Sequence, residues 1–98
     1  YDSIYCLESD LRKVNVYGDV PQQPLCSYYG KLTDLPQALF ENGFLRVGRS
    51  DVVNMRYIRQ ISGYKVTMRN GVELSVSRNG YAAIRETYLE WKGQFGDE

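Results

Sequence analysis

The clearest pattern in the chain is an alternation of apolar and polar positions on both sides of an Asn-Gly pair. Apolar residues occupy every second position over 64–68 and again over 72–76, with Asn70 and Gly71 between them. Alternation with a period of two predicts two strands that each bury one face, and Asn-Gly predicts a hairpin turn. A three-residue loop over 69–71 keeps the apolar positions opposite one another, whereas a two-residue loop would mix the faces. The predicted register therefore requires a positive φ at Gly71, in a bulge.

Shorter apolar stretches predict five more strands, at residues 3–8, 12–17, 25–29, 44–47 and 58–61. Polar or turn-forming residues separate these stretches, as they do between the strands of small antiparallel sheets. The polar stretch 9–11 is expected to connect the first two strands.

A segment in the middle of the chain follows the period of a helix instead. The apolar residues at positions 32, 35, 39 and 40 predict a short helix of about two to three turns. Thr33 is expected to cap this helix and Pro36 to lie in its first turn. Asn42 and Gly43 are expected to end it.

The C-terminal part of the chain also has helical spacing. Apolar residues at positions 81, 84, 88 and 91 predict a helix over about 81–92 that stops at Gly93. Asn79 and Gly80 are expected to lie in the loop or first turn that leads into it. The whole pattern predicts a strand-rich fold with one short helix in the middle and one at the C-terminus.

Length and composition fit one folded domain. The chain has 98 residues, of which 43% are hydrophobic and 24% charged, which is too apolar for a disordered chain. We expect a single domain over 1–98, with its core at about 3–92 and a frayed tail at 93–98. No apolar run is long enough to span a membrane, and the N-terminal residues do not have the charged-then-apolar pattern of a signal peptide. Because the chain begins at Tyr1 rather than Met, we expect it to be cut from a longer protein.

Histidine is absent, and cysteine occurs twice, at Cys6 and Cys26. Two thiols without histidine cannot form a zinc site, so no metal is expected. We expect both cysteines to be reduced, buried and structural in a cytoplasmic protein; the alternative is one disulfide between them. No signature motif of an enzyme is present, and no histidine can activate a serine or cysteine. We therefore expect neither catalysis nor a cofactor.

The net charge of zero hides a strong gradient along the chain. Residues 44–85 carry eight basic and two acidic side chains, a net charge of +6, and the remainder carries −6. Seven of the eight bases are arginine, the side chain suited to forked contacts with phosphate or guanine. Charge alone leaves two readings equally open: an anionic partner, or a solvated face balanced by acidic neighbours in space.

Polar, mostly basic turns follow three of the predicted strands, at residues 9–13, 48–50 and 77–79. Loops on a rigid scaffold are favoured places for binding residues. Gly48 would let a backbone approach a ligand closely. Ser50 and Ser77, beside Arg49 and Arg78, can contact phosphate or cap the next segment, and capping is favoured.

Four blocks of sequence resemble the LytTR family of DNA-binding domains, in the family's order and spacing. They are IYCLES at 4–9, YGKL at 29–32, FLRVGRSDVVN at 44–54 and LSVSR at 74–78. The similarity extends over about residues 3–92, and the RVxRSxVVN core with VSR downstream is more specific than a single short motif.

The resemblance implies a mainly β fold in which small antiparallel sheets stack into an elongated, layered β sandwich with one or two short helices. LytTR domains are output domains of bacterial two-component response regulators, which work by phosphorelay. They read double-stranded DNA with loops that enter neighbouring major grooves. By position, the contacts would come from Arg12 with Lys13, from the loop at 48–50, and from Arg78 with Asn79. The family commonly has histidine where this chain has Gly48, so only backbone remains for a contact there.

We therefore expect sequence-specific binding of double-stranded DNA in transcription regulation. Arg49 and Arg78 are the candidates for reading bases, and Arg12 and Lys13 are assigned mainly to phosphate. The further candidates in the same turns are Gly48, Ser50, Ser77 and Asn79. We expect Arg46 and Asn54 to be structural. These assignments require folding to bring Arg12, Lys13, Arg49 and Arg78 to one face.

By resemblance, a receiver domain would precede this chain in the full-length protein, and dimerisation on paired half-sites would depend on it. Two other functions stay open. One is a β-rich protein-interaction module, and the other is a binder of RNA or single strands that stacks bases on its tyrosines.

Overall fold

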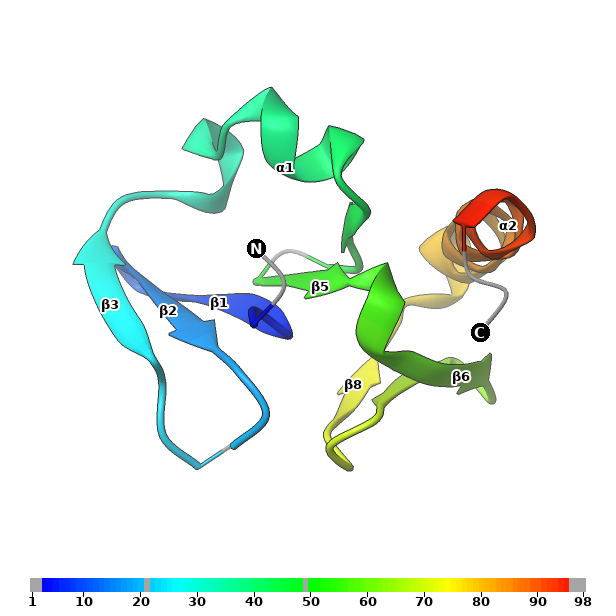
Figure 1. Cartoon of the computed structure of the whole chain (residues 1–98), viewed down its shortest axis with the longest axis horizontal. Coiled ribbons are helices and arrows are strands. Elements are labelled where there is room, and N and C mark those ends of the chain that lie inside the picture. The colour runs from blue at the N-terminus through cyan, green and yellow to red at the C-terminus, as the bar shows by residue number, and fades with distance from the viewer. Residues whose placement is uncertain (1–2, 21, 49, 96–98) are drawn as a thin grey trace.

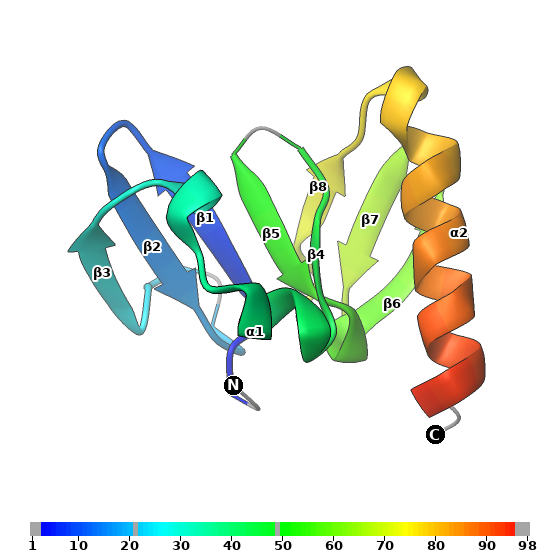
Figure 2. The ribbon, with the colours of Figure 1, turned by 90° about the horizontal axis from the view of Figure 1, so that it is seen from above.

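Two antiparallel sheets and a long C-terminal helix form the body of the molecule (Figures 1 and 2). The structure, a computed structural model, describes residues 3–20, 22–48 and 50–95. The first sheet has the order β3-β2-β1-β5-β4 and the second the order β6-β7-β8. The strands of the first sheet are β1 (Cys6–Asp10), β2 (Lys13–Tyr17), β3 (Cys26–Tyr29), β4 (Phe44–Arg46) and β5 (Asp51–Asn54). Those of the second sheet are β6 (Ile58–Ser62), β7 (Lys65–Met68) and β8 (Glu73–Ser75).

The mainly β fold is confirmed, but the body is not elongated, since its principal extents are 33 × 29 × 26 Å. The helical segments are two 3₁₀ turns and two α-helices. They are η1 (Leu32–Asp34), α1 (Gln37–Glu41), η2 (Met55–Tyr57) and α2 (Arg78–Phe95).

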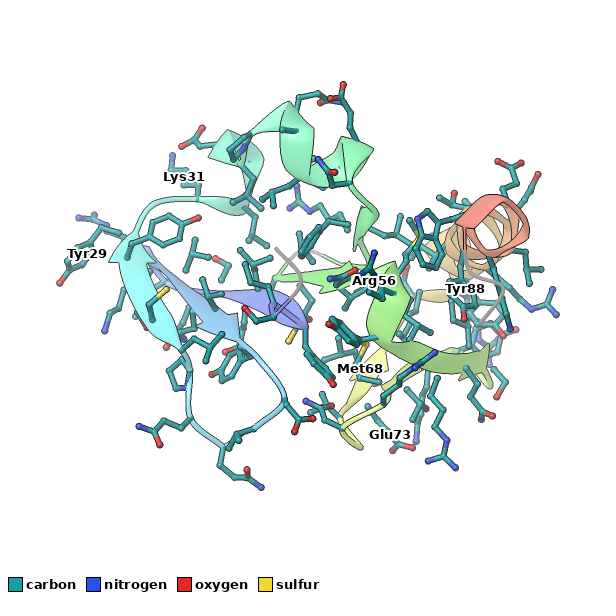
Figure 3. The ribbon with its side chains drawn as sticks, viewed as in Figure 1. Tyr29, Lys31, Arg56, Met68, Glu73 and Tyr88 are labelled. Carbon is teal, nitrogen blue, oxygen red and sulfur yellow. The ribbon has the colours of Figure 1, made fainter. Side chains whose placement is uncertain are left out.

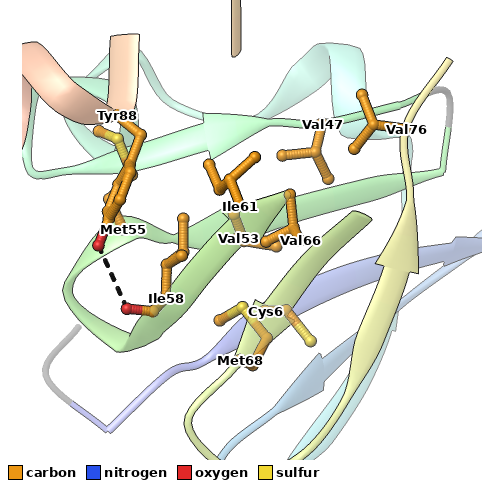
Figure 4. Packing of buried hydrophobic residues seen from close by; sticks show 10 residues of the cluster. All are labelled: Cys6, Val47, Val53, Met55, Ile58, Ile61, Val66, Met68, Val76 and Tyr88. Atoms are coloured by element: carbon orange, nitrogen blue, oxygen red, sulfur yellow. Dashed lines mark hydrogen bonds between the residues drawn. The ribbon is translucent and has the colours of Figure 1, made fainter. Parts of the chain in front are cut away.

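The first sheet has an apolar cluster on each of its faces. Leu7 and Val52 belong to the cluster that includes Leu32 and Leu39, under η1 and α1. Cys6 and Val53, their neighbours in sequence, point to the other face and join the cluster shared with the second sheet and α2 (Figure 4). The first sheet is therefore the middle layer, with helices on one face and the second sheet on the other.

Because β5 is buried on both faces, the pattern of apolar positions does not predict it as a strand. Val52 and Val53 are both fully buried, one on each face. A strand buried on both faces has no alternation, and a short apolar run does not by itself identify a strand. Asn54 ends β5 as a structural residue, as expected. Its side chain donates to the Ile4 carbonyl (2.9 Å) and accepts from the Arg56 amide (3.1 Å).

The hairpin of β7 and β8 has the predicted register. Val66 lies opposite Leu74, and the Met68 amide donates to the Val72 carbonyl at 2.8 Å. Gly71 has φ +93°, so the three-residue loop with a left-handed glycine is confirmed.

The first hairpin is tighter than predicted. Asp10 lies opposite Lys13 in the pairing of β1 with β2, so only Leu11 and Arg12 form the turn. Ser9 and Asp10, expected in the connection, belong to β1, and residues 3–5, expected in the strand, precede it.

The prediction of one continuous helix in the middle of the chain is wrong, because a proline divides this segment. Leu35 has an extended conformation (φ −64°, ψ 143°), as steric contact with a following proline ring requires. The segment is therefore a 3₁₀ turn that contains Thr33, followed by the separate helix α1 with Pro36 as its N-cap. Asn42 is the C-cap and Gly43 has φ +93°, so the predicted end is confirmed.

Helix α2 is longer than predicted at both ends. It begins at Arg78, where Ser77 Oγ accepts a hydrogen bond from the Gly80 amide at 3.3 Å, so the capping role of Ser77 is confirmed. It continues through Gly93 to Phe95, because a glycine weakens a helix without ending it. The tail predicted at 93–98 is thus helical to Phe95, and residues 96–98 lie outside the described residues.

The two cysteines differ in environment. Both are free, so the disulfide alternative is wrong. Cys6 is buried, and its burial, followed by the charges of Asp51 and Glu8, raises the pKa of its thiol to about 12. Cys26 is exposed, contrary to expectation, because β3 is the edge strand of its sheet and leaves all four of its side chains exposed.

Two glycine substitutions test whether the β7–β8 turn requires a positive φ. A Cβ atom at Gly71 or at Gly93 would have no heavy atom within 4 Å, but only Gly71 has a positive φ. We expect Gly71→Ala to lower the free energy of unfolding by about 1 kcal/mol. Gly93→Ala, inside α2, should raise it by about 0.5 kcal/mol. Urea denaturation measures both, and equal effects of the two substitutions would contradict the left-handed turn.

Candidate nucleic-acid interface

The turns singled out in the sequence lie along one edge of the molecule. Figure 2 shows the β1–β2 turn, the end of β4 with the beginning of β5, and the start of α2 at the same edge. The Ser9 amide donates to the Ser50 carbonyl at 2.7 Å, which ties the first turn to the second. Val47 and Val76 belong to one buried cluster and bring the end of β4 close to the segment before α2 (Figure 4).

The β1–β2 turn carries two of the predicted site residues. Arg12 and Lys13 are both exposed. The Gly30 amide donates to the Arg12 carbonyl at 2.9 Å, so the backbone of the turn is held by the segment after β3. The side chains of Arg12 and Lys13 therefore extend from a backbone that hydrogen bonds hold in place.

The β4–β5 loop holds Gly48 and Ser50, and Arg49 between them lies outside the described residues. The Val47 amide donates to the Asp51 carbonyl at 3.0 Å, which closes the loop. Arg46 Nε donates to the Gly48 carbonyl at 3.0 Å, so Arg46 is structural, as expected. Gly48 is exposed and a Cβ there would have no heavy atom within 4 Å. Neither space nor a positive φ requires glycine at this position.

The start of α2 carries the remaining predicted residues, Ser77, Arg78 and Asn79, all exposed. The guanidinium carbon of Arg78 lies 5.5 Å from the centroid of the Tyr64 ring, within the range of a cation–π contact. The Tyr64 ring in turn packs against Tyr81, with centroids 4.8 Å apart. Arg78 is therefore held from one side by an aromatic pair.

Tyr64 was missed as a site residue, because the alternating pattern assigns it to a strand face. It has φ +61° and forms the β6–β7 turn with Gly63, between the paired residues Ser62 and Lys65. Glycine at position 63 was the available signal for a turn at this point.

Acidic side chains lie close to this edge. Glu8 faces Asp51 in the pairing of β1 with β5. Burial, and then the charge of Glu8, raise the pKa of Asp51. Burial also raises the pKa of Tyr17, whose hydroxyl donates to Glu8 Oε1 at 3.4 Å. Part of the basic excess is balanced locally too, since Lys65 Nζ lies 3.9 Å from a Glu73 carboxylate oxygen.

A model of the LytTR family, described as the LytTr DNA-binding domain, matches residues 1–88. The match includes the whole of the edge just described. The chain belongs to the LytTR family.

Comparison with solved structures shows a shared fold. A structure described as the LytTr DNA-binding domain of a methyl-accepting/DNA response regulator from Bacillus cereus has 23% sequence identity and a TM-score of 0.67. The alignment covers 90% of this chain and 82% of that chain, so the two share a fold. No curated protein matches the chain.

As a LytTR domain, the chain is a DNA-binding domain. Among the residues that the structure describes, no helix is long and apolar enough to cross a membrane. Within the same residues, no three His, Cys, Asp or Glu side chains are grouped so as to hold a metal ion.

The raised pKa of Asp51 predicts a pH-dependent effect of neutralising it. Above that pKa, the folded state holds a partly buried charge beside Glu8, which the unfolded chain does not. We expect Asp51→Asn to raise the melting temperature at pH 7. The gain should shrink as the pH falls through the raised pKa and vanish below the usual range of Asp, where both states bind the proton.

Thermal unfolding of both proteins between pH 3 and pH 7 measures this effect. Asp10→Asn, at the exposed end of β1, is the matched control and should change the melting temperature less. A lower melting temperature of Asp51→Asn at pH 7 would show that the carboxylate makes a net favourable interaction.

Proposed function

We propose that this LytTR domain binds double-stranded DNA sequence-specifically by inserting loops of one edge into the major groove. The observation that carries the proposal is the convergence of the β1–β2 turn, the β4–β5 loop and the start of α2 at that edge (Figure 2). These segments are far apart in the sequence, and each carries exposed polar or basic residues.

The size of the edge supports contact with more than one groove. The β1–β2 turn and α2 lie toward opposite ends of the longest dimension of the molecule (Figure 2), which is 33 Å. Successive major grooves on one side of B-DNA are about 34 Å apart. The full width of the domain is therefore close to the spacing of neighbouring major grooves.

In this proposal each candidate has a role set by its chemistry. Arg49 and Arg78 donate to guanine O6 and N7, and Arg12 and Lys13 neutralise phosphates. The Tyr64 ring limits the conformations open to Arg78, which lowers the entropy lost when it binds a base.

The remaining candidates in the turns act mainly through backbone and short polar groups. Gly48 offers only its backbone, while Ser50 and Asn79 donate or accept hydrogen bonds at the DNA. Ser77 caps α2 through the Gly80 amide and so fixes the position at which the start of the helix meets a phosphate.

The domain is further proposed to act as the output domain of a cytoplasmic bacterial response regulator. The Tyr5 amide donates to the Tyr17 carbonyl, at the end of β2 away from the β1–β2 turn. A receiver domain joined to the N-terminal segment would therefore approach from the side opposite the loops. Dimerisation through that receiver would place two such domains on paired half-sites.

Removing the base-reading arginines tests the site. We expect Arg78→Ala and Arg49→Ala each to weaken binding to a duplex selected from a random library by about 1–3 kcal/mol, and to relax the preference at one base pair. Arg69→Ala is the matched control, because Arg69 is an exposed arginine at the far end of β7 from Tyr64. It should bind like the unchanged chain.

Fluorescence anisotropy on the selected duplex and its single-base variants measures these effects. Unchanged binding by both alanine variants would show that the bases are read elsewhere on the domain.

Salt dependence tests whether the partner is duplex DNA. We expect log affinity to fall linearly with log salt concentration, with a slope of about −0.9 for each phosphate neutralised. Arg12→Ala and Lys13→Ala should each make the slope shallower by about one unit. Tighter binding to single strands of the same sequence would instead favour stacking on exposed tyrosines such as Tyr28 and Tyr29. No binding to either would favour a protein-interaction module.

A further inference from the structure

A leucine at the tip of the β1–β2 turn is almost completely exposed. Leu11 has 95% of its surface accessible, in a turn of only two residues between the paired Asp10 and Lys13. A single exposed apolar residue is common on protein surfaces. The position of this one on the proposed DNA-facing edge is what sets it apart.

The backbone at Leu11 is unfavourable for leucine as well. Its φ is +59°, a left-handed conformation that favours Gly, Asn or Asp in a tight turn. Leucine has neither the freedom of glycine nor a polar group to bond the turn, and here it packs against nothing that would compensate. Strain of this kind at an exposed tip indicates a role in binding rather than in folding.

Positive φ outside glycine occurs twice among the described residues, at Leu11 and at Tyr64. Both residues lie in two-residue turns, and Tyr64 contacts Arg78 at the same edge. The unfavourable backbone conformations are therefore confined to the edge that carries the proposed DNA contacts.

The surroundings of Leu11 indicate the chemistry of its partner. A shallow hollow beside the tip is lined by Asp10, Leu11, Arg12, Lys13 and Tyr29. Tyr29 is 83% exposed and lies at the outer edge of the sheet (Figure 3). An apolar tip that Asp10 precedes and two cations follow fits a groove with phosphates along its walls and an apolar group at its floor. In the major groove that apolar group is the C5-methyl of thymine.

We propose that Leu11 is a specificity-determining residue that packs against the C5-methyl group of a thymine when the β1–β2 turn enters the major groove. This proposal rests on the proposed function, since it needs the edge to face duplex DNA. It assigns a base preference to a turn whose charged residues Arg12 and Lys13 contact mainly phosphate.

Replacing thymine by deoxyuridine removes only the methyl group and leaves the pairing unchanged. In the selected duplex, each thymine is replaced singly and binding is measured at fixed salt. We expect one replacement to weaken binding of the unchanged chain about fourfold, the effect of losing one buried methyl group. Leu11→Ala should weaken binding of the thymine duplex about tenfold. For this variant, the same deoxyuridine replacement should cause no further loss of affinity.

Leu11→Ala still requires a positive φ at position 11 and removes only the exposed isobutyl group, so it should fold as the unchanged chain does. Val20→Ala is the control, because Val20 is also exposed (57%) but follows the other end of β2. It should bind like the unchanged chain and keep the response to deoxyuridine. Circular dichroism melts confirm that all three proteins are folded.

The outcomes separate this inference from the proposed function. If no duplex is selected, the proposed function fails and the thymine contact fails with it. If a duplex is selected and Arg78→Ala weakens its binding, but Leu11→Ala does not, only the thymine contact is overturned. It is also overturned if Leu11→Ala weakens binding while every deoxyuridine replacement affects both proteins equally, because Leu11 would then contact something other than a thymine methyl.

Discussion

The pairing of β1 with β5 is the interaction on which the rest of the structure depends. Three strands, a 3₁₀ turn and a helix separate these strands in the sequence. They nevertheless lie side by side in the middle layer, with Leu7 opposite Val52 and Cys6 opposite Val53. Adjacent residues of each strand bury opposite faces, so the same pair supports both apolar clusters. Burial of this kind, rather than local propensity, is what makes a three- or four-residue segment a stable strand.

The same pairing explains why the turns share an edge. In an antiparallel pair, the end of one strand lies beside the beginning of the other. The end of β1 and the beginning of β5 therefore emerge together, and the hydrogen bond from Ser9 to Ser50 closes the edge at that point. The second sheet adds the start of α2, because β8 runs toward this edge and Val76 packs into the cluster that also holds Val47. The shared edge of the turns thus follows from strand direction, and the apolar core lies away from it.

The local features that were predicted correctly depend on neighbours in sequence. The register of β7 and β8, the positive φ of Gly71 and the end of α1 just before Gly43 follow from turn chemistry and a period of two. Two of the errors have a cause outside the segment: burial on both faces hides β5, and the edge position of β3 exposes Cys26. A third error is local, because Pro36 restrains Leu35 and divides the middle helix. Periodicity reports one face of an isolated element, so it fails where both faces or neither are covered.

The sequence by itself determined the mainly β class, the hairpin register, the basic turns and membership of the LytTR family, because these depend on residue type and short spacing. Tertiary structure alone decided that Arg12, Lys13, Gly48, Ser50 and Arg78 lie along one edge, that Tyr64 contacts Arg78, and that Leu11 is exposed at a strained tip. Such placements depend on contacts between segments distant in the chain. Those contacts form only when several strands bury apolar surface together, and no local pattern encodes their geometry.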